Sequence, residues 1–359
     1  MIILYCGREA QDDHLIRAAV AHRHHYRLIE VDEIPVPTDG NPVHSSNHEP
    51  VAIVHSATDL SAVLNAVHCE KSVDDTHDPT VIIPMTAGRD LHSITVLAQA
   101  VLWWKRSNPA ARIIISRPIG NRTTRVSALR ANMRSNPALS YVIFSVALDP
   151  FFDADLFRDA RLAWQYGHAD ISVAFDGAAP SLSKAIHHAE IILDDACARN
   201  STPGGKWPRC METTAPEIRV SQGDSTTVSE RIVVVRADLM PATDNELHQG
   251  GQKYREVPLW TPSALAVLIE QNIADARADL SGFDSQDTQR AHHGERTEHY
   301  GRRPVPVIGM EAALWADHDS GFAHSHGDDD GHHTHSHHHH PHTHMHSHKS
   351  FHADHHHRH

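Results

Sequence analysis

The chain of 359 residues is longer than one hydrophobic core of typical size requires, so its length favours two domains. Hydrophobic residues make up 40% and charged residues 21%, which is typical of a globular protein and excludes disorder of the whole chain. The net charge of −13 disfavours nucleic-acid binding, because that binding needs a basic face that displaces counterions from phosphates.

Four short β-branched runs in the first half predict parallel strands separated by crossover helices. In the first helical stretch, Leu60, Val63, Leu64 and Val67 recur at helical spacing and can bury one stripe. The expected strands cover residues 2–5, 51–54, 81–84 and 113–115, and the expected helices cover 60–67, 94–102 and 125–133.

The second half repeats this alternation of strands and helices. A stretch rich in Ser, Thr, Pro and Gly, 199–229, predicts a long surface insertion. The expected strands are 141–146, 171–175 and 232–235, and the expected helices are 153–166, 181–197 and 263–280, the last closing this half.

We therefore expect an α/β fold of two similar domains, each with a parallel sheet flanked by helices. The first domain is expected over 1–138 and the second over 139–282. A charged linker, 283–317, would lead to a disordered histidine-rich tail, 318–359.

Nineteen of the 36 histidines lie in residues 318–359. Imidazole is a ligand suited to zinc, nickel, copper and cobalt, so the tail predicts binding of several divalent ions in interchangeable geometries. A purification tag is the alternative, but no run reaches six histidines and other residues interrupt the pattern. The expected metal ligands are His332, His333, His335, His337, His338, His339, His340, His342, His344, His346 and His348.

Several motifs of nucleotide and zinc enzymes are missing. The sequence contains no GxxxxGK[ST], GxGxxG or HExxH pattern, which argues against a phosphate-binding loop, a dinucleotide site and a zinc protease. We expect a divalent metal ion (cobalt, nickel or zinc) and no nucleotide.

Cysteine usage and the amino terminus predict a cytoplasmic protein without a membrane partner. The four cysteines are scattered and form no CxxC pair, which favours a reducing compartment over a disulfide framework. The chain begins without a basic secretion-type region and has no run of about 18 apolar residues. Whether the protein is a homo-oligomer is left open.

Polar residues that follow the predicted strands of the first half are the candidate site. Ligands of open parallel sheets bind beyond the carboxyl ends of the strands, where these residues should converge. A thiol, imidazoles, carboxylates and guanidinium groups together suit a reaction that joins a metal ion to a polycarboxylate macrocycle. The candidates are Cys6, His55, Asp90 and His92, with Arg8, Arg89 and Arg117.

Four of these candidates also have a structural interpretation. Cys6 fits a small buried hydrophobe, and His55 fits a satisfied histidine at a sheet edge. Asp90 fits the N-cap of the following helix, with Gly88 easing the turn before it. Arg117 is equally suited to solvent.

Two of these strand ends resemble the CbiX-type sirohydrochlorin chelatase family, the class II chelatases that insert cobalt, nickel or iron into a tetrapyrrole without ATP. The segments are Cys6-Gly7-Arg8-Glu9, where the family has His-Gly-Ser/Thr-Arg, and residues 83–90, where it has an apolar strand, Pro and a Gly-Gly-His turn. Residues 149–157 are similar to the start of the second half in long relatives, some of which carry histidine-rich segments. The resemblance covers residues 1–282, and Cys6 and Asp90 depart from it by replacing histidines.

The resemblance implies ATP-independent insertion of cobalt or nickel into sirohydrochlorin or a related tetrapyrrole in cobalamin-type biosynthesis. In this interpretation Cys6, His55 and His92 approach the metal and Asp90 accepts protons. Arg8, Arg89 and Arg117 hold the acetate and propionate groups of the tetrapyrrole, while the tail raises the local metal concentration. The alternatives are a metal storage or delivery protein without chelatase chemistry, and a catalytically silent regulator that still binds tetrapyrrole.

Overall fold

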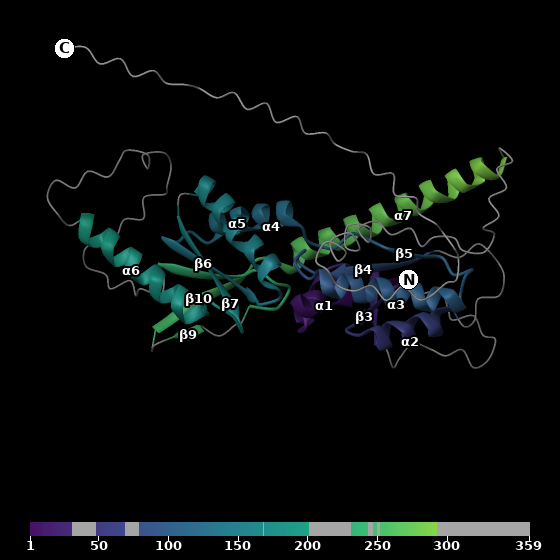
Figure 1. Ribbon diagram of the computed structural model, residues 1–359, viewed down its shortest axis with the longest axis horizontal. Helices are drawn as coiled ribbons and strands as arrows, with labels where there is room; N and C mark the ends of the chain where they lie inside the picture. Colours follow the sequence, from purple (N-terminus) through teal and green to yellow (C-terminus); the bar gives the residue numbers. More distant parts are fainter. Residues whose placement is uncertain are drawn as a thin grey trace, which may run out of the picture. The chain divides into compact units, whose positions relative to one another are not determined.

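A computed structural model describes most of the chain as two parallel sheets flanked by helices, which confirms the expected α/β fold (Figure 1). The histidine-rich tail, most of the predicted insertion and most of the predicted linker lie outside the described residues. The structure describes residues 1–30, 48–68, 79–167, 169–200, 231–242, 247–249 and 252–292.

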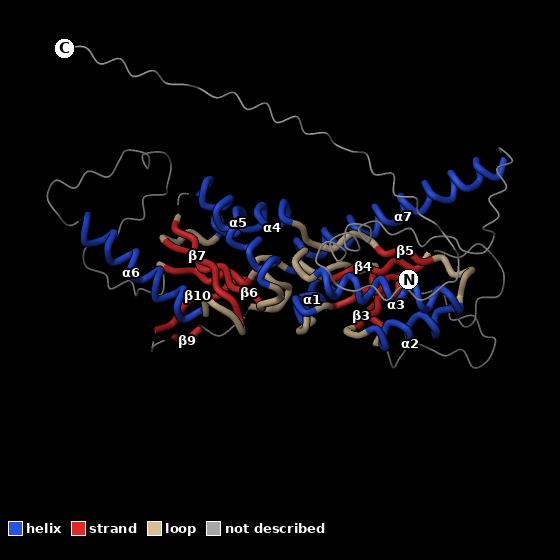
Figure 2. The backbone as a smooth tube through the Cα atoms, in the orientation of Figure 1, coloured by secondary structure: helices blue, strands red, loops and turns tan. Residues whose placement is uncertain are grey.

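The first sheet contains five parallel strands in the order β2-β3-β1-β4-β5. Figure 2 shows the strands in red and the helices that flank them in blue. Its central strands β1 and β4 are buried along their whole length, as expected for a parallel sheet covered on both faces. The strands are β1 (Ile2–Cys6), β2 (Tyr26–Ile29), β3 (Glu49–Val54), β4 (Thr80–Met85) and β5 (Ile113–Ile115). Between them lie a 3-10 turn (Arg8–Ala10), α1 (His14–Ala21), α2 (Ala57–His68) and α3 (Leu91–Ser107).

The second sheet has the order β7-β6-β8-β10-β9, in which only β9 is antiparallel to its neighbour. The order β7-β6-β8-β10 repeats β3-β1-β4-β5, so the two halves share one arrangement of parallel strands. The elements are β6 (Ser140–Val146), α5 (Pro150–Gly167), β7 (Asp170–Asp176), α6 (Leu182–Asn200), β8 (Ile232–Arg236), β9 (Leu247–Gln249) and β10 (Gln252–Pro258).

The helix that ends each half in sequence packs on the opposite half. Helix α4 (Arg122–Ser135) follows the first sheet but packs against α5 of the second. Helix α7 (Pro262–His292) follows the second sheet but packs against α1, β4 and β5 of the first (Figure 1). The expectation that the last helix closes the second half is therefore wrong, while the domain boundaries at 138 and 282 stay a prediction.

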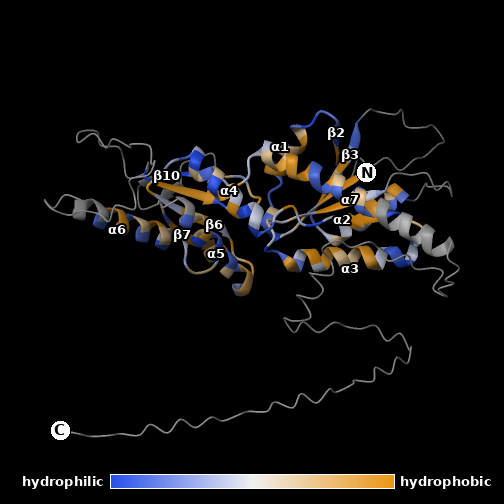
Figure 3. Cartoon of the chain, turned by 90° about the horizontal axis from the view of Figure 1, so that it is seen from above, coloured by the Kyte–Doolittle hydropathy of each residue, from blue (hydrophilic) through white to orange (hydrophobic). Residues whose placement is uncertain are grey.

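Buried hydrophobic side chains form three clusters. One cluster joins both sheets and includes Leu4 of β1, Ile143 of β6 and Ile269 of α7. The other face of the first sheet packs on α2 and α3, and that of the second sheet packs on α6. Helices such as α3 accordingly carry hydrophobic and hydrophilic faces (Figure 3). No helix among the described residues combines the length and apolarity needed to cross a membrane.

Candidate functional site

The carboxyl ends of four neighbouring strands, β3, β1, β4 and β5, position the candidate residues. Tyr5 of β1 lies opposite Val54 of β3, and Cys6 of β1 lies opposite Met85 of β4. Because these strands are parallel, the loops that follow them begin at the same edge of the sheet. We call this the carboxyl edge of the first sheet.

Cys6 lies in the hydrophobic core, with 2% of its surface exposed. Burial is the main cause that raises the pKa of its thiol, and the nearby charge of Asp13 adds to it. A protonated, enclosed thiol is a poor metal ligand, since the thiolate is the form that binds metals. This position fits the structural interpretation of Cys6 as a small buried hydrophobe.

Arg89 is fully buried and connects the two sheets. Its Nε donates to Glu9 Oε1 at 3.1 Å, and its Nη1 donates to Asp153 Oδ1 at 2.8 Å. Its Nη2 donates to Ser145 Oγ, at the carboxyl end of β6, at 2.5 Å. The guanidinium therefore holds internal carboxylates, and it is not exposed to receive those of a substrate.

Asp90 caps α3 and pairs with Arg8. Its Oδ1 accepts from the Ser93 backbone N–H at 3.2 Å and from Arg8 Nη2 at 2.7 Å, and its Oδ2 accepts from the Arg8 backbone N–H at 2.7 Å. Burial pushes the pKa of Asp90 upward, but the hydrogen bonds from Arg8 and Ser93 outweigh it and hold the pKa below its usual range. A carboxylate with a lowered pKa is a weak base.

The predicted N-cap role of Asp90 is thus confirmed, together with the turn at Gly88. Gly88 adopts a φ of 92°, a backbone conformation that favours glycine. A Cβ there would also lie 2.5 Å from the Gly120 carbonyl oxygen. The tight turn carries the chain from β4 into the cap of α3.

His55 is an accessible imidazole of the carboxyl edge. It follows β3, its side chain is 41% exposed, and its Nε2 lies 3.4 Å from Asp13 Oδ2. Arg17 Nε donates to both Asp13 oxygens at 2.9 Å. Burial opposes ionisation of Asp13, but hydrogen bonds from Arg17 and His55 hold its pKa below the usual range. Asp13 is therefore a charged carboxylate that orients the exposed ring.

Asp13 was not among the residues predicted from the sequence. Its signal was the Asp13-x-x-x-Arg17 spacing at the start of α1, which favours an ion pair across one helical turn. His92, in the first turn of α3, and Arg117, after β5, are both exposed. Arg8 remains 37% exposed at the same edge.

The structure thus brings His55 to Asp13 and Arg8 to Asp90, but it does not gather Cys6, His55 and Asp90 around one point. Within the described ranges, no group of three or more His, Cys, Asp and Glu side chains is arranged to hold a metal ion. The predicted tail ligands lie outside those ranges.

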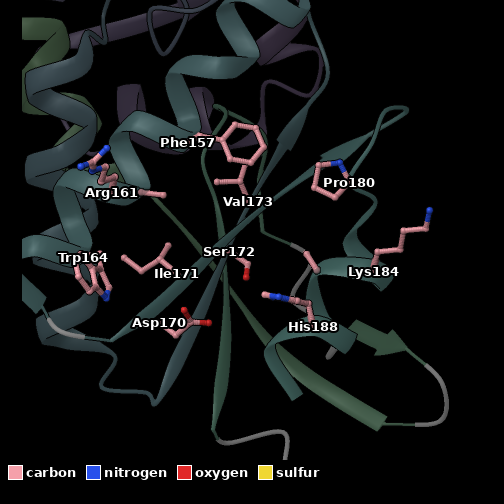
Figure 4. A pocket seen from close by; sticks show the side chains of 12 residues that line it. Phe157, Arg161, Trp164, Asp170, Ile171, Ser172, Val173, Pro180, Lys184 and His188 are labelled. Carbon is pink, nitrogen blue, oxygen red and sulfur yellow. The ribbon is translucent and has the colours of Figure 1, made fainter. Parts of the chain in front are cut away.

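A surface hollow of about 610 Å³ lies away from the carboxyl edge, along β7 (Figure 4). Phe157 and Trp164 of α5 flank one side, and Lys184 and His188 of α6 flank the other. β7 is the outer strand of its sheet, so the hollow follows a strand edge. Sequence reasoning missed it because its lining combines residues from three separate elements.

No protein-family model matches the chain. No curated protein matches its sequence. A solved structure, "SirB from Bacillus subtilis with Fe3+", is similar with a TM-score of 0.39 and 12% sequence identity, covering 78% of this chain and 97% of that chain. A similarity of this degree carries no functional conclusion for the present chain.

Proposed function

We propose that the protein inserts a divalent metal ion, cobalt or nickel, into sirohydrochlorin or a related tetrapyrrole of cobalamin-type biosynthesis, in the cytoplasm and without ATP. The observation that carries this proposal is the His55–Asp13 pair, an exposed imidazole held by a charged carboxylate at the carboxyl edge. The reaction exchanges one metal dication for two pyrrole protons, so it needs a group that removes protons beside the macrocycle. His55 is that group, and Asp13 fixes its ring.

The accessible guanidinium groups hold the substrate in this proposal. Arg8 is anchored through Nε and Nη2 to Asp90 yet stays partly exposed, and Arg117 is exposed after β5. Guanidinium groups bind carboxylates bidentately, which suits the acetate and propionate side chains of the macrocycle. His92 is exposed beside the Asp90 cap. In this proposal it is the second imidazole that approaches the metal ion.

The histidine-rich tail supplies the metal substrate. A ligand bound to a tethered segment reaches a high local concentration at any site within reach of the tether. The tail therefore affects the rate at low metal concentration and does not take part in the proton transfer.

The test of the proposed reaction mixes the full chain, cobalt and sirohydrochlorin and follows the absorption spectrum of the tetrapyrrole. We expect the wild-type rate to exceed the protein-free rate, and His55→Gln to lower it by about 100-fold, the lower end of the contribution of a general base. His187→Gln is the matched control, because His187 is an exposed histidine on α6 of the second sheet. No acceleration by the wild-type chain would refute the proposed reaction.

Metal storage or delivery without chelatase chemistry is the second candidate. The clustering of nineteen histidines in residues 318–359 favours it. Calorimetry with sirohydrochlorin separates the two, because a chelatase binds the tetrapyrrole at its α/β body whereas a storage protein releases no heat with it.

A further inference from the structure

Four histidines surround a hollow at the opposite edge of the first sheet, where β2 and β3 begin. The hollow has a volume of about 370 Å³, and Arg23 also lines it. All four imidazoles are exposed, and none belongs to the carboxyl edge. We call them the amino-edge histidines: His22, His24, His25 and His48.

The backbone fixes the spacing of this set. His22 is the C-cap residue of α1, and its N–H donates to the Ala18 carbonyl oxygen at 3.1 Å. The turn closes where the Tyr26 N–H donates to the Arg23 carbonyl oxygen, also at 3.1 Å. Three of the four histidines therefore belong to the short, hydrogen-bonded connection between α1 and β2.

The fourth imidazole comes from the neighbouring strand. The Glu49 N–H donates to the His25 carbonyl oxygen at 2.8 Å, and Tyr26 pairs with Glu49 in the parallel register. His25 and His48 immediately precede these paired residues, so their backbones are about one strand spacing apart, roughly 5 Å. Two imidazoles at that spacing can bind one ion.

A carboxylate lies beside His25. Glu270 of α7 has its Oε1 at 3.6 Å from His25 Nε2, while its Oε2 accepts from Arg23 Nη2 at 2.7 Å. A carboxylate beside a metal-binding histidine orients the ring and leaves the other nitrogen for the ion. The same carboxylate pairs with Arg23, the cation that lines the hollow.

We propose that the amino-edge histidines bind one divalent transition-metal ion of the zinc, nickel, cobalt or copper class. In this proposal His25 and His48 are the two required ligands. Imidazole is the ligand type that this class of ion prefers. The described side chains do not already converge, since no set of three donors surrounds a common point. Exposed side chains change rotamer within nanoseconds, so rotation of the rings closes the site around the ion. This proposal is independent of the metal-insertion reaction.

The test uses the full chain and nickel ion, added beyond the capacity of the tail. Diethyl pyrocarbonate modifies each accessible histidine, and peptide mass spectrometry gives the rate at each position. At nickel about tenfold above the dissociation constant, we expect modification of His25 and His48 to slow by about tenfold, because protection follows the bound fraction. His187, exposed on α6, should keep its rate.

A double variant, His25→Gln with His48→Gln, identifies the ligands. It should abolish nickel protection of the two remaining amino-edge histidines, whereas His187→Gln leaves that protection intact. Unchanged rates at His25 and His48 with nickel, or protection that survives in the double variant, would overturn the proposal.

Discussion

The charged residues Glu9, Arg89 and Asp90, which follow β1 and β4, are buried and hold loops together. Arg89 pairs with Glu9 and Asp153, and Asp90 pairs with Arg8. Burying a charge without a partner is costly, so each of these groups is fixed by its neighbours. Residue type alone predicted that these positions carry charge, but only the packing decides between a substrate contact and an internal ion pair.

Asp90→Asn isolates the ion pair from the helix cap, because asparagine caps helices as well as aspartate does. We expect a loss of about 2 kcal/mol at pH 7, since Arg8 loses its charged partner. The folded-state pKa of Asp90 is lowered, so its contribution is full above the unfolded value of about 3.9 and is lost as the pH falls through the folded value. Urea unfolding at pH 7 and at acidic pH compares Asp90→Asn with the wild type, and a difference in unfolding free energy that stays constant across this range would contradict the assignment.

Arg89→Met tests the link between the sheets. Removing the guanidinium leaves Glu9 and Asp153 buried near each other without a cation, so we expect destabilisation of about 4 kcal/mol. Arg117→Met is the control, and because Arg117 is exposed we expect a change within about 0.5 kcal/mol. Equal unfolding free energies of the two variants would show that Arg89 is not structural.

Helix α7 is the element whose position differs most from the expectation. Its sequence places it at the end of the second half, yet its apolar face covers α1 and the first sheet. Ile269 is buried on that face, while Val267 is 42% exposed. The pattern of apolar residues identifies the buried stripe of a helix but not the sheet that covers it.

Ile269→Ala measures the packing of α7. We expect it to lower the free energy of unfolding by about 3 kcal/mol, through lost burial and the cavity that remains. Val267→Ala on the exposed face should change it by less than about 0.5 kcal/mol. Unfolding in guanidinium chloride compares the two variants. A similar loss of unfolding free energy in both would contradict the observed packing face.

Seven of the ten strands in the described part of the chain could be predicted, because each is a short β-branched run bounded by polar residues. β2 and β10 were missed since their apolar residues alternate with charged ones, as in Arg27 and Arg255. β9 and α1 were missed because they are short, with three and eight residues. For the site, the ends of the predicted strands indicated the carboxyl edge. The position of Asp90 just before an expected helix predicted its role as the N-cap. The sequence left open whether Cys6 is buried or faces a ligand, and the burial of Arg89 could not be predicted, because both depend on contacts with distant segments.

At the scale of the whole molecule, the two sheets share a core and a hydrogen-bonded link. The largest hydrophobic cluster contains strands of both sheets, and the Leu239 N–H donates to the Glu9 carbonyl oxygen at 2.8 Å. Helix α4 of the first half also contacts the second half, and helix α7 of the second half contacts the first. Neither sheet therefore has a complete core of its own.

We expect the α/β body to unfold in one cooperative transition. Far-ultraviolet circular dichroism and tryptophan fluorescence should report the same midpoint in urea, because loss of one sheet exposes the core of the other. Two resolved transitions would show that the halves are independently stable.

The direct test of the functional account is the initial rate of cobalt insertion into sirohydrochlorin by the full chain and by a chain that ends at residue 317. We expect both proteins to exceed the protein-free rate at saturating cobalt, and only the full chain to do so at limiting cobalt, because the tail concentrates the metal. If the full chain fails to accelerate insertion at any cobalt concentration, the carboxyl edge is not a chelatase site.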